Sequence, residues 1–219
     1  MRKSKYLIIN SFYFDFNNDL TDIINVKKLF KNQTVLDLFR FDKITIIKKI
    51  NYENNINFIY LPQSIEIIDD ESFESNQIKI LDLSNYTKLK AIEFRSFEYN
   101  QIKQLKLPQN IETIDAYAFK NNQIESLDLS NCINLNIISQ CAFEYNQIKQ
   151  LKLPKNIETI DVYAFKNNQI ESLDLSNCIN LNIISQCAFE YNQIKQLKLP
   201  KNIKEIYSEA FCSNKINVL

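Results

Sequence analysis

Five cysteines are the residues of this 219-residue chain best suited to redox, nucleophilic or metal chemistry. A thiolate can attack a substrate, form a disulfide or bind zinc. Nucleophilic use needs a base and mixed zinc sites need histidine, but the chain contains no histidine. The cysteines are Cys132, Cys141, Cys178, Cys187 and Cys212.

Charged side chains recur at regular intervals along the chain. In one series aspartate alternates with lysine, and in a second lysine alternates with glutamate. If the members lie on adjacent parallel strands about 4.8 Å apart, each charge neutralises its neighbours. Two interpretations stay open: a dipolar strip that binds a partner, and a soluble face whose charges satisfy one another. The first series is Asp82, Lys106, Asp128, Lys152, Asp174 and Lys198, and the second is Lys103, Glu125, Lys149, Glu171 and Lys195.

Three consecutive acidic residues, Asp69, Asp70 and Glu71, could attract a cation. They lack the spaced oxygen ligands of a calcium loop, so we predict a solvated turn. The chain also has no glycine, which excludes a P-loop, a dinucleotide fingerprint and a nucleophile elbow. We therefore predict no enzyme activity, no cofactor, and no catalytic or metal site.

The composition also limits the classes of partner. With 26 basic and 26 acidic residues the net charge is zero, whereas nucleic acids and anionic membranes attract basic surfaces. We expect neither nucleic acid nor a membrane as a partner, and no apolar run approaches the roughly 18 residues of a membrane span. The 34 isoleucines and 29 asparagines, whose codons are AT-rich, indicate an AT-rich genome.

The first 14 residues resemble a signal peptide only in part. Asn10 and Ser11 interrupt the apolar stretch, and no alanine precedes Ala91 to make a cleavage site. We expect a cytoplasmic protein, with secretion or cell-surface display as the alternative. The sequons at Asn32 and Asn85 matter only for that alternative.

The chain is built from repeats. Residues 105–150 and 151–196 are identical except that Gln109 and Ala116 become Lys155 and Val162. Each block has two related halves, and the leading leucines alternate at spacings of 22 and 24 residues. A coil of this length cannot bury its own apolar side, so stacked coils must share one core. The leading leucines are at positions 61, 83, 107, 129, 153, 175 and 199.

Each coil contains a strand and a return segment. Leu127 and Leu129 alternate with polar residues, as in a half-buried strand, and Pro108 or Pro154 ends the strand in alternate coils. Because glycine is absent, we expect asparagine in the turns that need a left-handed backbone. One phenylalanine from each coil is expected in a single buried column: Phe73, Phe97, Phe119, Phe143, Phe165, Phe189 and Phe211.

This arrangement separates the cysteines. Cys132 follows the strand and Cys141 follows the return segment, so the two should lie on opposite rims. Cys132 and Cys178 stand two coils apart, about 9.5 Å, beyond the ~7 Å Cα limit for a disulfide. We interpret the cysteines as reduced apolar fillers, which favours an intracellular location.

The recurring pattern LxLPxxIxxIxxxAFxxNxIxxL resembles the BspA-like leucine-rich repeats, also called the Treponema pallidum type. The resemblance implies a leucine-rich-repeat solenoid, an α/β-type horseshoe that is mostly β. It places a parallel sheet on the concave face and short return strands and turns on the convex face. It also implies a binding scaffold without catalytic residues. The chain departs from the family at Asp69, Asp115 and Asp161, where glycine is usual.

The two ends of the array differ. We predict an N-terminal cap over residues 1–35, with one helix from Asn18 to Phe30, and about eight repeat units over residues 36–219. At the other end, Ile216 and Leu219 align with Ile194 and Leu197, so another strand begins there. An uncapped sheet edge predicts self-association through the C-terminal end.

These features predict a non-enzymatic scaffold for protein–protein interaction, and the alternative is a secreted or surface adhesive repeat protein. Two nearly identical blocks offer the same surface twice, so specific recognition should lie in the divergent coils. Tyrosine, phenylalanine and arginine are enriched at interfaces. We predict that a partner protein contacts Tyr86, Lys88, Phe94 and Arg95; the other interpretation is that Phe94 packs on the cap.

Overall fold

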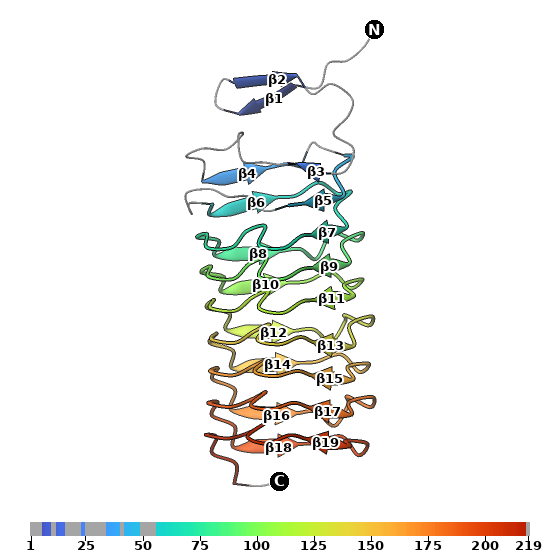
Figure 1. Cartoon of the computed structure of the whole chain (residues 1–219), viewed down its shortest axis with the longest axis vertical. Helices are drawn as coiled ribbons and strands as arrows, with labels where there is room; N and C mark the ends of the chain where they lie inside the picture. The colour runs from blue at the N-terminus through green and yellow to red at the C-terminus, as the bar shows by residue number, and fades with distance from the viewer. Residues whose placement is uncertain are drawn as a thin grey trace.

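The computed structural model describes residues 6–9, 12–15, 23–24, 34–39, 42–48 and 56–217. These ranges contain strands and turns but no helix. Two columns of short strands run along the long axis of the molecule (Figure 1). Near the N-terminus, β1 (Tyr6–Ile9) and β2 (Phe12–Asp15) form an antiparallel pair.

The first column consists of three-residue strands in which a buried or partly buried central residue is flanked by two outward-facing ones. We call its outer surface the sheet face. Hydrogen bonds join the strands in parallel, in the ladders β4–β6, β8–β10–β12–β14 and β16–β18. The members are β4 (Val35–Asp37), β6 (Phe58–Tyr60), β8 (Ile80–Asp82), β10 (Gln104–Lys106), β12 (Ser126–Asp128), β14 (Gln150–Lys152), β16 (Ser172–Asp174) and β18 (Gln196–Lys198).

The second column contains the two-residue return strands, which also pair in parallel. They are β3 (Ile23–Ile24), β5 (Ile46–Ile47), β7 (Ile67–Ile68), β9 (Ala91–Ile92), β11 (Thr113–Ile114), β13 (Ile137–Ile138), β15 (Thr159–Ile160), β17 (Ile183–Ile184) and β19 (Glu205–Ile206). The predicted parallel-sheet solenoid with return strands is therefore confirmed.

The expected helix over 18–30 lies mostly outside the described residues. At Ile23 and Ile24 the structure has strand β3 instead, with Ile23 opposite Ile46 of β5. β-Branched isoleucines fit a strand, and the edge of β5 supplies the backbone partners. The expected cap boundary at residue 35 falls next to undescribed residues and stays a prediction.

The core contains the expected column of phenylalanine rings. Successive rings stack nearly parallel, with centroids 5.2–5.6 Å apart from Phe73 to Phe211. The first six rings are fully buried, whereas Phe211 in the last coil is only partly buried. Each inner ring is therefore covered by a neighbour on both sides.

The expectation that asparagine occupies the left-handed turns is wrong at most positions. Each turn around a core phenylalanine has two residues with positive φ, and in most coils they are Tyr, Cys, Glu, Ser or Arg. Asparagine takes this role only at Asn121 and Asn167 among the described residues. The backbone N–H groups of the turn donate to carbonyls of the next coil, as Tyr117 does to Gln140 at 3.0 Å. These bonds hold the strained conformation without glycine.

The recurring asparagine instead joins neighbouring coils from inside the core. The Oδ1 atom of Asn146 accepts the Ile124 N–H at 3.0 Å, and its Nδ2 donates to the carbonyls of Phe119 and Phe143 at 2.9 and 3.2 Å. The same bonding recurs in other coils, at Asn100 and Asn192 for example. A buried amide therefore satisfies backbone groups that the short strands leave unpaired.

Candidate binding surface

The sheet face carries two columns of outward residues, one on each side of the buried central residues. The first outward column changes along the array from large apolar side chains to glutamine and serine. It runs Val35, Phe58, Ile80, Gln104, Ser126, Gln150, Ser172 and Gln196. The second outward column runs Asp37, Tyr60, Asp82, Lys106, Asp128, Lys152, Asp174 and Lys198.

The six charged residues predicted to form a ladder make three separate ion pairs. The Lys Nζ and Asp Oδ2 atoms are 3.0 Å apart for Lys106 and Asp82, and 2.9 Å apart in the two later pairs, Lys152–Asp128 and Lys198–Asp174. Each aspartate also accepts a serine hydroxyl at 2.6 Å. The hydrogen bonds from Ser176 and Lys198 lower the pKa of Asp174 to about 2. This geometry supports the interpretation of a self-neutralised face, and a role in binding stays a prediction.

The three N-terminal coils present an apolar patch on the same face. We define the patch as Val35, Phe58, Tyr60 and Ile80, which are 39%, 48%, 52% and 52% exposed. Val35 lies opposite Phe58 in the β4–β6 pair, and Ile80 holds the equivalent place on β8. Large apolar side chains gathered on an outer surface mark interaction sites. This patch is absent from the predicted site residues, although the strand alternation that predicted the charged series also places Val35, Phe58 and Ile80 on the outer surface.

Tyr86 lies at the border of the patch and is half-buried. Its hydroxyl accepts the Leu61 N–H at 3.1 Å, so it ties the end of β6 to the following coil. Burial raises the pKa of Tyr86, and the nearby carboxylates of Asp37 and Asp82 add to that effect. Tyr86 is thus a structural residue beside the patch rather than a fully exposed one.

Phe94 and Arg95 belong to a different cluster, in the turn after β9. The Phe94 ring packs edge-on against Tyr117 of the next coil, with centroids 5.6 Å apart. The Arg95 guanidinium lies 4.9 Å from the Phe94 centroid and 5.2 Å from that of Tyr117, and its Nε is 3.3 Å from Oε2 of buried Glu98. Lys88 is exposed. Phe94 and Arg95 therefore share one cluster, Tyr86 has its contact with Leu61, and binding of a partner at the four predicted residues stays a prediction.

The sequence matches the BspA type leucine-rich repeat region in six copies, over residues 22–146 and 117–219. The chain belongs to the BspA-type leucine-rich repeat family. A leucine-rich repeat protein from Eubacterium ventriosum is a distant structural neighbour, with 14% identity, a TM-score of 0.27, and coverage of 86% of this chain and 78% of that chain. No curated protein matches the chain.

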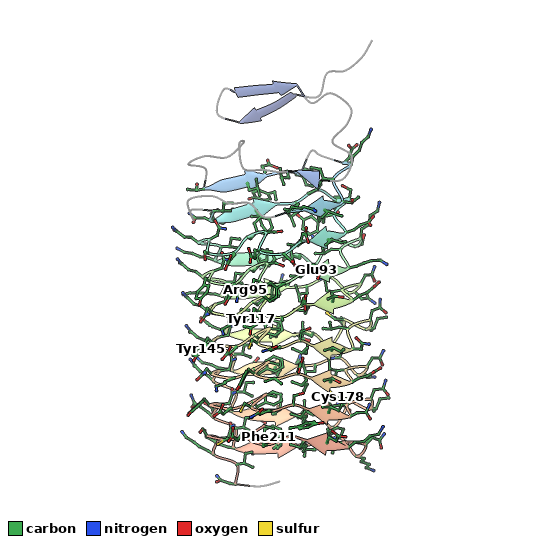
Figure 2. The ribbon with its side chains drawn as sticks, in the orientation of Figure 1. Glu93, Arg95, Tyr117, Tyr145, Cys178 and Phe211 are labelled. Carbon is green, nitrogen blue, oxygen red and sulfur yellow. The ribbon has the colours of Figure 1, made fainter. Side chains whose placement is uncertain are left out.

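This BspA-type array also contains two inner ion pairs that sequence reasoning missed. Lys120 Nζ lies 2.7 Å from Glu144 Oε2, and Lys166 Nζ lies 2.6 Å from Glu190 Oε2. Tyr117 and Tyr145 flank Lys120, with ring centroids 5.1 and 5.8 Å from its Nζ. Figure 2 shows Arg95, Tyr117 and Tyr145 following one another down the stack. The signal in the sequence was the alternation of Glu and Lys directly after the core phenylalanine.

The five cysteines of the array are unpaired thiols. Burial raises the pKa of Cys132 and Cys178 to about 11, and that of Cys141 and Cys187 to about 12. Neighbouring carboxylates, such as Glu144 beside Cys141, act in the same direction. At neutral pH these four thiols are protonated and therefore weak nucleophiles. The positions support their interpretation as apolar fillers.

The acidic cluster has structural partners. Asp70 accepts the Phe94 N–H at 3.2 Å, and Glu71 donates its N–H to the Phe94 carbonyl at 2.8 Å. Glu93 lies nearby, and burial together with neighbouring aspartates raises its pKa. Across the described ranges, no group of three or more Cys, Asp or Glu side chains could hold a metal ion. The same ranges contain no helix long and apolar enough to cross a membrane.

Proposed function

We propose that this repeat array is a non-enzymatic scaffold that binds another protein through the apolar patch of its N-terminal coils. The observation that carries the proposal is the change along the first outward column. Phe58 and Ile80 are about half exposed, whereas the equivalent positions in the next two coils are Gln104 and Ser126. The fold tolerates polar residues at these positions, so stability of the array does not require the apolar ones. Leaving such side chains in water is unfavourable unless a partner covers them.

The charge distribution supports a protein as the partner. In the later coils the sheet-face lysines pair with aspartates of the neighbouring coils, and the chain as a whole is neutral. Nucleic acids and anionic lipids require an unpaired basic surface. A mixed apolar and polar surface is typical of protein interfaces.

The test uses substitutions that the array itself contains. Phe58→Gln and Ile80→Ser install the residues found at positions 104 and 126. Ile133→Thr, which replaces an exposed isoleucine outside the sheet face with the residue found at position 87, is the control. Chemical crosslinking in the native cell, followed by purification and mass spectrometry, should recover a partner with the wild type and the control. Recovery should fall by about tenfold or more with the double variant. Equal recovery by all three chains contradicts the proposal.

The alternative role, a secreted or surface adhesive protein, differs from this proposal in location. The unpaired thiols support an intracellular scaffold, because secreted proteins tend to form disulfides. Cell fractionation separates the two. Protein recovered outside the cell with glycan on Asn32 or Asn85 would favour the adhesive role.

A further inference from the structure

The strand pair β4–β6 lacks a charge that the equivalent strand pairs contain. In three pairs of identical register, an aspartate lies opposite a lysine: Asp82–Lys106, Asp128–Lys152 and Asp174–Lys198. In the fourth, Asp37 lies opposite Tyr60. No lysine or arginine among the described residues is ion-paired with Asp37, which is exposed.

Among the described residues, the Asp37 carboxylate accepts a hydrogen bond at Oδ1 alone, which leaves Oδ2 for a ligand. Its Oδ1 accepts the Phe39 N–H at 3.1 Å, as Oδ1 of Asp82 accepts the Ser84 N–H at the same distance. In Asp82, the Oδ2 atom contacts the lysine of the neighbouring strand at 3.0 Å. The corresponding position beside Asp37 is occupied by the Tyr60 side chain, which is about half exposed.

We propose that the partner is a polypeptide segment that combines apolar side chains with one lysine or arginine. This inference rests on the proposed function and names its partner's chemistry. The apolar side chains cover Val35, Phe58 and Ile80, and the cation binds the free oxygen of Asp37 beside the Tyr60 ring. The two outward columns hold residues i and i+2 of each strand, about 6.6 Å apart, so one short segment can reach both columns.

The chain already uses the same recognition within its own fold. Lys120 pairs with the Glu144 carboxylate while it lies between the rings of Tyr117 and Tyr145. A carboxylate next to an aromatic ring therefore suits a lysine or arginine, which gains both an ion pair and a cation–π contact. An acidic segment is disfavoured, because it would place like charges against Asp37 and Asp82.

The experiment selects random dodecapeptides displayed on phage against the folded full-length chain. Clones that also bind the Phe58→Gln/Ile80→Ser chain are discarded. The remaining sequences should combine at least two apolar residues with a lysine or arginine. Synthetic copies are then titrated against Asp37→Asn, which keeps the acceptor for the Phe39 N–H, and against Tyr60→Lys, which installs the ion pair of the other coils. The matched control is Asp128→Asn.

We expect Kd to rise about three- to tenfold for Asp37→Asn and Tyr60→Lys, with no change for Asp128→Asn. If no peptide distinguishes the wild type from the double variant, the proposed function itself fails. If peptides bind the patch but lack basic residues, or Asp37→Asn binds them equally well, only the partner chemistry is wrong. Hydroxyl-radical footprinting that finds Phe58 and Tyr60 protected in the free chain would also overturn the inference. In that case a second copy or the chain's own N-terminal residues cover the patch, and sedimentation distinguishes the two.

Discussion

The rings of Phe119 and Phe143 stack with their centroids 5.4 Å apart and their planes 7° apart. Phe143 stacks in the same way on Phe165, 5.6 Å away on its other side. Phe211, in the last coil, stacks on Phe189 alone among the described residues. This asymmetry makes the contribution of each ring to stability depend on its position in the column.

We expect Phe143→Ala to lower the free energy of unfolding by about 3–5 kcal/mol, because it opens a cavity between two neighbours. Phe211→Ala should cost clearly less, since that ring is partly exposed and has one stacking neighbour. Urea denaturation followed by circular dichroism measures both values. Equal losses would contradict a core built from nearest-neighbour contacts.

Replacing the buried amide Asn146 by alanine should cost about 2–4 kcal/mol. The substitution leaves the Ile124 N–H without its acceptor inside the core and removes the shorter of the two amide hydrogen bonds to the Phe119 carbonyl, which keeps the one from Asn122. Asn110→Ala is the control, because exposed Asn110 makes a single bond of 2.9 Å to the Thr87 carbonyl. It should change stability by less than about 1 kcal/mol. A small loss at Asn146 would mean that water replaces the amide.

We expect the free energy of unfolding to fall when one partner of the inner ion pair is removed, and to recover when both are removed. Lys120→Met leaves the buried Glu144 carboxylate uncompensated and should cost about 2–3 kcal/mol. Adding Glu144→Leu should restore most of the loss, because no unpaired charge remains. At the surface, Lys152→Met, opposite Asp128, should cost less than about 1 kcal/mol. If the double variant is as unstable as Lys120→Met, the pair contributes through packing instead of charge.

Thiol labelling should distinguish Cys212 from the other cysteines. Cys212 is exposed, whereas the other four are buried and have pKa values of about 11 or 12. At pH 8 we expect iodoacetamide to modify Cys212 in the folded chain and the others only after unfolding. Mass spectrometry of tryptic peptides reports each site.

The same thiols predict a pH dependence at alkaline pH. Their folded pKa values lie above the ordinary value of 9.0, so unfolding favours ionisation. The stabilisation that the four protonated thiols give the folded chain is complete below about pH 9, and it is lost as the pH rises toward 11–12. Replacing the four buried cysteines by alanine should flatten this part of the stability profile. An unchanged slope would assign it to other groups.

The last coil should promote self-association of the 219-residue chain. Ile206 is 44% exposed, although the equivalent residues Ile138, Ile160 and Ile184 are fully buried. We propose that copies associate through this surface at high concentration. Ile206→Lys should weaken the association, because a charge on an edge strand opposes pairing, and Ile137→Lys on an inner coil should not. Sedimentation velocity over a concentration series tests this, and a strict monomer at high concentration would contradict it.

The sequence by itself determined the solenoid. Its duplicated blocks, the alternation around Leu127 and the recurring phenylalanines predicted stacked coils, parallel strands and the ring column. These features depend on local periodicity, which a single chain displays directly. The spacing of Asp82 and Lys106 likewise predicted that opposite charges would meet.

Only the tertiary structure decided which polar, charged and turn residues of neighbouring coils contact one another. It placed Tyr117 and Cys141 in the left-handed turns, brought Lys120 to Glu144, and used the Tyr86 hydroxyl to hold Leu61. It also set Asp37 opposite Tyr60, beside outward apolar residues whose places in the later coils are taken by glutamine and serine. These contacts join residues about one coil apart, and each depends on backbone hydrogen bonds and burial that exist only after the coils have stacked. Periodicity reports which residues are equivalent, whereas the packed stack decides which of them remain exposed to a partner.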